Sequence, residues 1–220
     1  MIVNKSLDLS HPVILNKIEE KAVSALNNQL GSMNSENKES FLIQQKEALW
    51  LLQNQKEYLL PEGRYTLTNQ WECIEGPFHK EVILAQLIVA VSCKEYKTDS
   101  ITEGLLMHLL QISYLNAVRE YIKVVMFPGL YAYYFKEKAP FITTYYGPGL
   151  FEQPLKTMRS MYDAVGAEQI GVTINENSLK PCSSFIGSLY VLKEPVAEEM
   201  PCKRCKAKIG CEYCMIRKAR

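Results

Sequence analysis

Residues 82–91 read Val-Ile-Leu-Ala-Gln-Leu-Ile-Val-Ala-Val, and the expected class of fold follows from this run. Gln86 is its only polar residue, so the run has no polar face with which a surface helix could meet water. Valine and isoleucine fill half of its positions, and β-branched residues favour strands. The run is also far too short to cross a bilayer as a helix. We therefore predict a buried central strand of a sheet.

The part of the chain before this run predicts a helical hairpin. A first helix is expected over residues 10–31, because Ser10 and Pro12 are typical of a helix start and apolar residues then recur at helical spacing. A second apolar row predicts a helix over residues 41–58. Threonine and aromatic residues then indicate an extended segment over residues 65–74.

The part after this run mixes further helices and strands. The patterns predict a long helix over residues 102–127, a strand over 141–146, a short helix over 154–165, and strands over 170–175 and 185–192. Strict alternation of strand and helix is missing, so a doubly wound fold is not expected. The predicted class is α+β, with the helical hairpin packed on a mixed or antiparallel twisted sheet.

We expect one domain followed by a tail. The domain comprises residues 1–198, of which 1–60 form the helical part, and residues 199–220 form a cysteine-rich basic tail. With 220 residues, 47% of them hydrophobic, the chain is long enough for one sizeable core. The net charge of +1 does not steer the whole molecule towards nucleic acid. The N-terminus lacks the pattern of a secretory signal and no apolar run is long enough to span a membrane, so we expect a cytoplasmic protein.

The tail carries two CxxC pairs, which predict a metal site. The four thiols belong to Cys202, Cys205, Cys211 and Cys214. Four thiolates suit tetrahedral zinc or an iron–sulfur cluster, and the basic residues around them would offset the negative charge. The alternative is a basic tail with free or redox-active thiols. The other three cysteines, Cys73, Cys93 and Cys182, lie in apolar or strand-like surroundings that are typical of buried thiols.

Two polar residues of the domain have both a functional and a structural interpretation. Glu176 directly follows a predicted strand, a position from which side chains reach the open edge of a sheet and can meet a ligand. Capping the following turn is at least as good an explanation. His108 lies within the long predicted helix, where a core histidine with a satisfied partner is the simpler interpretation. The sequence contains no phosphate-binding loop, dinucleotide fingerprint or serine hydrolase elbow.

One segment of about forty residues carries a family resemblance. It has the turn Gly147-Pro148-Gly149, a helix, the run Gly-Ala-Glu-Gln-Ile-Gly-Val-Thr-Ile-Asn-Glu-Asn-Ser over residues 166–178, and then Pro181, Ser184 and Gly187. This pattern resembles the activation domain of cobalamin-dependent methionine synthase. The resemblance implies a curved α+β domain with an antiparallel sheet, S-adenosylmethionine held near the sheet edge, and docking against a cobalamin-carrying domain. In that family, cobalt(II) cobalamin is reduced by one electron and remethylated from S-adenosylmethionine.

The chain departs from the family pattern at several positions. The family arginine four positions before the last turn glycine falls on Tyr145, and a phenol cannot bind a carboxylate bidentately as an arginine does. The family tyrosine after that glycine becomes Leu150, and a serine near the end of the pattern becomes Ile186. A glutamate of the family's long helix aligns with Asn116.

Two functions follow from these observations. The first is a stand-alone corrinoid-protein reactivation factor, which docks on a cobalamin-binding protein or methyltransferase and assists reductive reactivation or S-adenosylmethionine-dependent remethylation. The alternative is a non-catalytic docking or chaperone-like subunit that has lost S-adenosylmethionine binding. In both, no membrane is involved and nucleic acid is not the expected partner. The expected ligand-binding residues are Gly147, Pro148, Gly149, Glu176 and Ser184, together with Tyr145 and Tyr146. The two tyrosines would offer a flat stacking surface for an adenine or a corrin edge, and strand packing is the alternative explanation for them.

Overall fold

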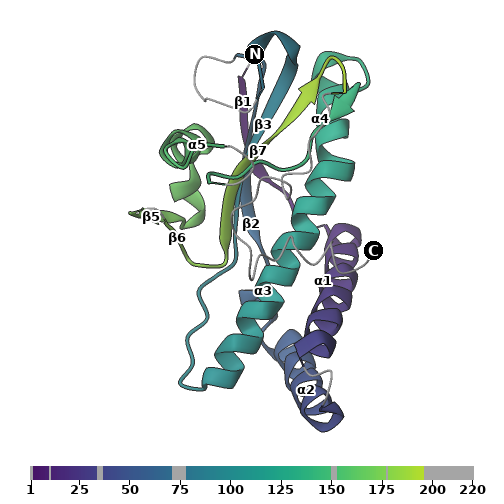
Figure 1. Cartoon of the computed structure of the whole chain (residues 1–220), viewed down its shortest axis with the longest axis vertical. Coiled ribbons are helices and arrows are strands. Elements are labelled where there is room, and N and C mark those ends of the chain that lie inside the picture. The colour runs from purple at the N-terminus through teal and green to yellow at the C-terminus, as the bar shows by residue number, and fades with distance from the viewer. Residues whose placement is uncertain are drawn as a thin grey trace.

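The predicted central strand lies in the middle of the sheet. The computed structural model describes residues 2–9, 11–33, 37–70, 78–149, 153–176 and 178–195. Its main sheet has the order β1 (Ile2–Leu7), β2 (Glu62–Thr68), β3 (Ile83–Ser92), β7 (Ser184–Leu192) and β4 (Phe141–Ile142) (Figure 1). Each neighbouring pair is antiparallel. The α+β class is therefore confirmed, and the sheet is antiparallel rather than mixed.

Both faces of β3 are buried, which explains its uniformly apolar sequence. Leu87, Val89 and Val91 point into the main core, whereas Ile88 and Ala90 point into a second core on the opposite face. The second core lies under α5 (Thr157–Val165) and a separate two-stranded sheet of β5 (Thr173–Asn175) and β6 (Ser178–Lys180). A strand that is covered on both sides loses the alternation of a half-exposed strand.

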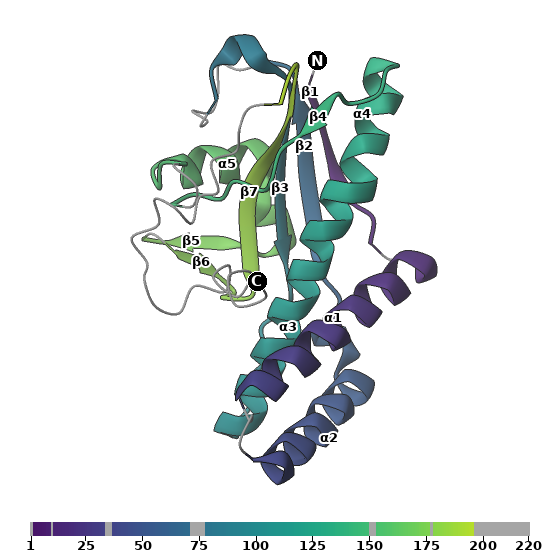
Figure 2. The ribbon, with the colours of Figure 1, turned by 45° about the vertical axis from the view of Figure 1, so that its right-hand side comes forward.

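Helices cover the main core. They are α1 (Pro12–Met33), α2 (Lys38–Asn54), α3 (Ile101–Tyr121) and α4 (Phe127–Phe135), of which α3 and α4 are joined by a π-helical turn (Ile122–Met126). Figure 2 shows α3 and α4 crossing one face of the sheet and α1 packing across the lower half of α3. The side chains of Asn37 and Ser100 accept hydrogen bonds from the first turns of α2 and α3. The predicted helical hairpin is thus confirmed, and it packs on the sheet chiefly through α3.

β2 holds the end of α5. Thr66 donates to the Ala164 carbonyl at 2.7 Å, and Arg64 donates to the Val165 carbonyl at 3.1 Å. Gly166 then ends α5 in the left-handed region with φ of +66°, where a side chain would be strained. These contacts place α5 and the segment that follows it against the second core.

Several boundaries differ from the sequence predictions. The first residues form strand β1, where only Leu7 is buried, because this edge strand is held by backbone pairing to β2 rather than by an apolar pattern. The extended segment predicted over residues 65–74 begins earlier, at Glu62, and residues 71–77 lie outside the described part of the chain. The strand predicted over 141–146 is reduced to β4 and an isolated bridge between Tyr146 and Ser188.

Two further predicted elements have boundaries that differ from those in the structure. The long helix does not end at Phe127 but continues to Phe135, because the π-helical turn shifts the hydrogen bonds just before Pro128, which has no N–H to donate. The strand predicted over 170–175 is shorter than expected. Its first residue, Ile170, ends the 3-10 turn η4 (Ala167–Ile170), and only residues 173–175 form a strand. Among the residues that the structure describes, no helix combines the length and the apolar character needed to span a membrane.

Candidate functional site

The segment before the Gly147-Pro148-Gly149 turn packs closely on β7. A Cβ atom built on Gly187 would overlap the outer end of the Tyr145 ring and lie 2.5 Å from the carbonyl oxygen of Tyr146. Only glycine therefore allows the Tyr145 ring to lie across the strand at this position. The ring also meets Phe185 edge-on, with the ring centroids 5.3 Å apart.

Arg119 completes a cluster around the Tyr145 ring. Its guanidinium lies 5.1 Å from the ring centroid of Tyr145 and 4.4 Å from that of Phe185, which is the geometry of a cation–π contact. The same guanidinium donates a hydrogen bond of 3.1 Å to the side-chain oxygen of Asn116, one turn earlier on α3. We call Asn116, Arg119, Tyr145, Phe185 and Gly187 the Arg119 cluster.

Sequence reasoning missed Arg119. The residue lies in a long helix with apolar residues on several faces, and Arg119 itself is only half-buried. The available signal was that Arg119 lies one helical turn after Asn116, and Asn116 is the position at which the family resemblance expects a glutamate. The cluster therefore joins two of the positions at which the chain departs from the family pattern, Asn116 and Tyr145.

Tyr146 is committed to the protein interior. Its backbone exchanges two hydrogen bonds of 2.8 Å with Ser188, and its side chain is buried. Its ring packs edge-on against Phe78 and Tyr190. Burial raises the pKa of Tyr190, whose hydroxyl accepts hydrogen bonds from Ser188 and Gln86. The Tyr146 ring therefore contributes packing rather than a flat surface for a ligand.

The glycine-proline-glycine turn is anchored at its far end. Gly147 is buried, Pro148 is half-buried and Gly149 is exposed. Gly149 has φ of +79° and donates to the carbonyl of Gln153 at 2.9 Å. The turn thus leads from the edge of β7 towards α5. Residues 150–152, which include Leu150, lie outside the described part of the chain.

Glu176 lies at the tip of the β5–β6 hairpin. It has φ of +54° and is exposed, and Ser178 donates to the carbonyl of Asn175 at 2.9 Å across the turn. Figures 1 and 2 show this hairpin on the side of the sheet that carries α5. A shared ligand pocket between Glu176 and the Gly147–Gly149 turn stays a prediction.

Ser184 lies at the start of β7. Its hydroxyl contacts that of Ser92 at 2.8 Å across the β3–β7 pair. The bridge of Tyr146 is at Ser188, four residues farther along the strand. The structure therefore brings Tyr145, Tyr146 and the turn together along β7, with Ser184 near the beginning of the same strand.

The predicted metal ligands Cys202, Cys205, Cys211 and Cys214 lie outside the described residues. Within residues 2–195, as far as they are described, no three His, Cys, Asp or Glu side chains gather in the manner of a metal site. Zinc or an iron–sulfur cluster in the tail stays a prediction.

The other cysteines divide into two environments. Cys93 is buried as predicted, and burial raises the pKa of its thiol to about 12. Cys182 is exposed, so the prediction of a buried thiol was wrong there. Its sulfur lies 3.9 Å from Nδ1 of His108 on α3. Cys73 lies outside the described residues.

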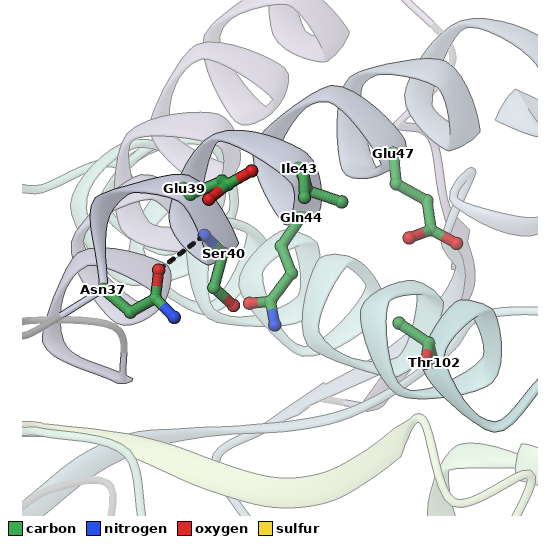
Figure 3. A pocket seen from close by; sticks show the side chains of 7 residues that line it. All are labelled: Asn37, Glu39, Ser40, Ile43, Gln44, Glu47 and Thr102. Atoms are coloured by element: carbon green, nitrogen blue, oxygen red, sulfur yellow. Dashed lines mark hydrogen bonds between the residues drawn. The ribbon is translucent and has the colours of Figure 1, made fainter.

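Two shallow grooves lie on the helical part, away from β7. The groove in Figure 3 has a volume of about 280 Å³ and is lined by the first turns of α2 and by Thr102 of α3. Its hydrogen bond from the Ser40 N–H to the Asn37 side chain, 3.0 Å long, is the N-cap of α2. The second groove, about 610 Å³, follows the polar face of α1. Neither groove includes a residue that the sequence predicted to bind a ligand.

The chain matches no protein-family model, and no curated protein matches its sequence.

Proposed function

We propose that this chain is a stand-alone reactivation factor for corrinoid proteins, with a fold like that of the methionine synthase activation domain. It would dock on a cobalamin-binding partner in the cytoplasm and assist reductive reactivation or remethylation of the corrinoid. The observation that carries the proposal is the Arg119 cluster beside the Gly147–Gly149 turn. The resemblance places an arginine where this chain has Tyr145, and Arg119 brings a guanidinium to within 5.1 Å of that ring.

The cluster supports recognition of an anionic group. A planar guanidinium binds a carboxylate more specifically than a point charge does, and cation–π contacts with two rings hold the Arg119 guanidinium at this position. The carboxylate of S-adenosylmethionine is the ligand group that the resemblance implies. Because Arg119 comes from α3, its charge reaches the edge of β7 from a different element than in the family. This explains how the chain could replace the missing arginine at position 145.

The experiment tests docking and chemistry together. The full chain is mixed under anaerobic conditions with the corrinoid-binding domain of a cobalamin-dependent methionine synthase in its cobalt(II) state, a reductant and S-adenosylmethionine. We expect the two proteins to comigrate on size exclusion and the visible spectrum to change to that of methylcobalamin. If the proteins neither associate nor change the spectrum, the proposal is rejected.

Matched arginine variants test the role of the cluster. Replacing Arg119 by Gln is expected to weaken S-adenosylmethionine binding by about 10- to 100-fold, because a hydrogen bond to a charged group contributes about 1.5–3 kcal/mol. The control is Arg159→Gln, since Arg159 lies on the exposed face of α5 and pairs with Asp163. Equal affinities of the two variants would show that the cluster does not bind the ligand.

The second candidate is a docking subunit without catalysis. It is favoured by the packing of both tyrosines, because Tyr145 lies on Gly187 and Phe185, and Tyr146 lies between Phe78 and Tyr190. Neither ring then stacks on an adenine or a corrin. Calorimetric titration separates the two functions, since comigration with the corrinoid domain but no heat of binding with S-adenosylmethionine would favour the docking subunit.

The proposed role of the tail depends on the metal that its cysteines bind. An iron–sulfur cluster held by its four cysteines would deliver the electron for reactivation, whereas zinc would make the tail a structural or docking clip. The local excess of basic over acidic residues lies in this short tail, so nucleic acid is not the proposed partner. An absorption spectrum and elemental analysis of anaerobically purified protein distinguish the two metals.

A further inference from the structure

Cys182 and His108 form a side-chain pair that the proposed function does not use. They are 74 residues apart in the chain, and the fold brings the sulfur to 3.9 Å from Nδ1 of the imidazole. The same nitrogen lies 3.4 Å from the hydroxyl oxygen of Ser183. The thiol is exposed, whereas Ser183 and its neighbour Gln111 are buried. Exposed sulfur and a fixed imidazole are the components of a reactive thiol site.

The direction of each hydrogen bond follows from Gln111. Its Nε2 donates to the backbone carbonyls of Tyr58, at 2.9 Å, and Lys94, at 2.8 Å. Because carbonyl oxygens only accept, the amide orientation of Gln111 is determined, and its Oε1 is the acceptor that faces Ser183. The Ser183 hydroxyl lies 2.5 Å from that Oε1, so it donates its single proton there.

The hydrogen bond from Ser183 to Gln111 determines the tautomer of His108. The Ser183 proton is directed at Gln111, so the Ser183 oxygen can only accept from Nδ1 of His108. Nδ1 therefore carries a hydrogen in this arrangement, and the Ser183 oxygen and the Cys182 sulfur lie 3.4 Å and 3.9 Å from this nitrogen. An N–H that faces a sulfur is the arrangement in which a thiolate, the nucleophilic form of cysteine, accepts a hydrogen bond.

We propose that Cys182 is a reactive thiol, positioned by His108, that undergoes exchange with anionic low-molecular-weight disulfides. The Cys182 thiolate attacks one sulfur of the disulfide R–S–S–R, forms the mixed disulfide Cys182–S–S–R and releases R–S⁻. Cys182 is oxidised and the departing sulfur is reduced, so no further oxidant is needed. The proton that Cys182 lost is taken up by the released thiolate.

The surroundings indicate the product and the class of substrate. Cys93, the other cysteine of the described residues, is buried and its thiol donates to the carbonyl of Leu59, so Cys93 is not the thiol that would resolve the mixed disulfide. Two exposed lysines adjoin the site. Lys180 lies two residues before Cys182 in the chain, and the backbone carbonyl of Lys94 accepts a hydrogen bond from Gln111. Their positive charge favours an anionic disulfide such as oxidised glutathione.

The test measures the rate at which the reduced full-length chain forms mixed disulfides with oxidised glutathione. Trypsin does not cut between lysine and proline, so residues 160–193 form one peptide, in which Cys182 is the only cysteine. Residues 81–94 form another, in which buried Cys93 is the only cysteine. Mass spectrometry of the two peptides therefore follows a reactive and a protected thiol in the same sample.

We expect Cys182 to react about three- to tenfold faster in the folded chain than in the urea-denatured chain. An ordinary thiol is only a few per cent thiolate at pH 7, and the gain from holding the thiolate is partly offset by its lower intrinsic nucleophilicity. Cys93 should react more slowly in the folded chain than in the urea-denatured chain, because it is buried. A folded rate for Cys182 at or below the denatured rate overturns the proposal.

Two variants separate positioning from folding. His108→Leu removes the N–H donor, so its rate at pH 7 should fall to that of the denatured chain and its rate–pH profile should become that of an ordinary thiol. Ser183→Ala keeps the imidazole but releases it from the network, so we expect an intermediate rate. Circular dichroism checks that each variant is folded. Unchanged rate–pH profiles in both folded variants would refute the role of His108. The result is independent of corrinoid binding, which this assay does not involve.

Discussion

Replacing Gly187 by Ala tests the close contact on which the candidate site is built. The added Cβ would overlap the outer end of the Tyr145 ring and lie 2.5 Å from the Tyr146 carbonyl oxygen. That oxygen accepts from the Ser188 N–H at 2.8 Å, so the backbone cannot move away without loss of the bridge to β7. The side chain at position 145 can rotate, but the carbonyl oxygen cannot. We therefore expect the edge of the sheet to be displaced.

The expected loss in the free energy of unfolding is about 1–4.5 kcal/mol. Overpacking contributes about 1–3 kcal/mol, and weakening the two bridge hydrogen bonds adds about 1–2 kcal/mol. Alanine recovers about 0.5–1 kcal/mol, because glycine loses more backbone entropy in a strand. Urea unfolding followed by far-ultraviolet circular dichroism measures the difference as a lower midpoint.

Gly129→Ala is the matched control. Gly129 is exposed in α4, and a Cβ built there meets nothing within 4 Å. Here the same substitution should raise the free energy of unfolding by about 0.5–1 kcal/mol. If Gly187→Ala is as stable as the wild type while Gly129→Ala behaves as expected, then Tyr145 does not lie across β7. Adding Tyr145→Ala to the Gly187 variant should recover part of the loss, since the two residues are in contact.

Three further predictions follow from other contacts. Gln111→Leu should lower the free energy of unfolding by about 2–4 kcal/mol in urea, because it leaves the carbonyls of Tyr58 and Lys94 and the buried Ser183 hydroxyl without the partner that buried Gln111 provides. The folded pKa of Cys93, about 12, lies above the unfolded value of 9.0, so its contribution to stability is complete below pH 9 and is lost as the pH rises towards 12. The urea midpoint of the wild type should therefore fall more steeply over this range than that of Cys93→Ala. Chelation of a tail metal should release about one zinc per chain or bleach an iron–sulfur spectrum, and a metal-free protein with four titratable tail thiols would contradict the metal prediction.

The elements with a strong apolar pattern could be predicted from the sequence. β3 and β7 are buried on both faces, β3 reads as a nearly continuous apolar run and β7 is mostly apolar, and α1, α2 and α5 have apolar stripes. β1 could not be found in this way, because it is an edge strand with one buried residue and its pairing partners lie more than fifty residues away. The π-helical turn was missed for a related reason, since proline and glycine normally end a helix and only the shifted hydrogen bonds allow it to continue.

The candidate site was predictable only in part. The glycines at 147, 149 and 187 indicate backbone geometry, and the structure gives a physical reason for Gly149 through its positive φ and for Gly187 through Tyr145. Arg119 could not be assigned, because nothing local shows that a residue on α3 reaches the ring of Tyr145. Motif reading finds residues that are close in the chain, whereas these contacts join α3 to a segment more than twenty residues farther along.

Helix α3 places both proposed sites against the first half of β7. Its polar residues His108, Gln111 and Arg119 contact Cys182, Ser183 and Phe185, respectively, so the order along the helix follows the order along the strand. His108 and Arg119 are eleven residues apart, which is about three turns and about 16 Å of helix, and this spacing returns them to nearly the same face.

A polar stripe in a largely covered helix is costly unless each member has a partner, and each of these residues has one on β7 or on the segment that leads into it. The stripe also helps to explain why α3 has little amphipathic contrast: its apolar residues pack on α1 and on the sheet, and these three polar residues contact β7 or the segment before it. Because one helix holds both sites, a substitution that shifts α3 along its axis should disturb the Arg119 cluster and the Cys182–His108 pair together, whereas changes at the exposed tip of the β5–β6 hairpin, away from Lys180, should leave both unaltered.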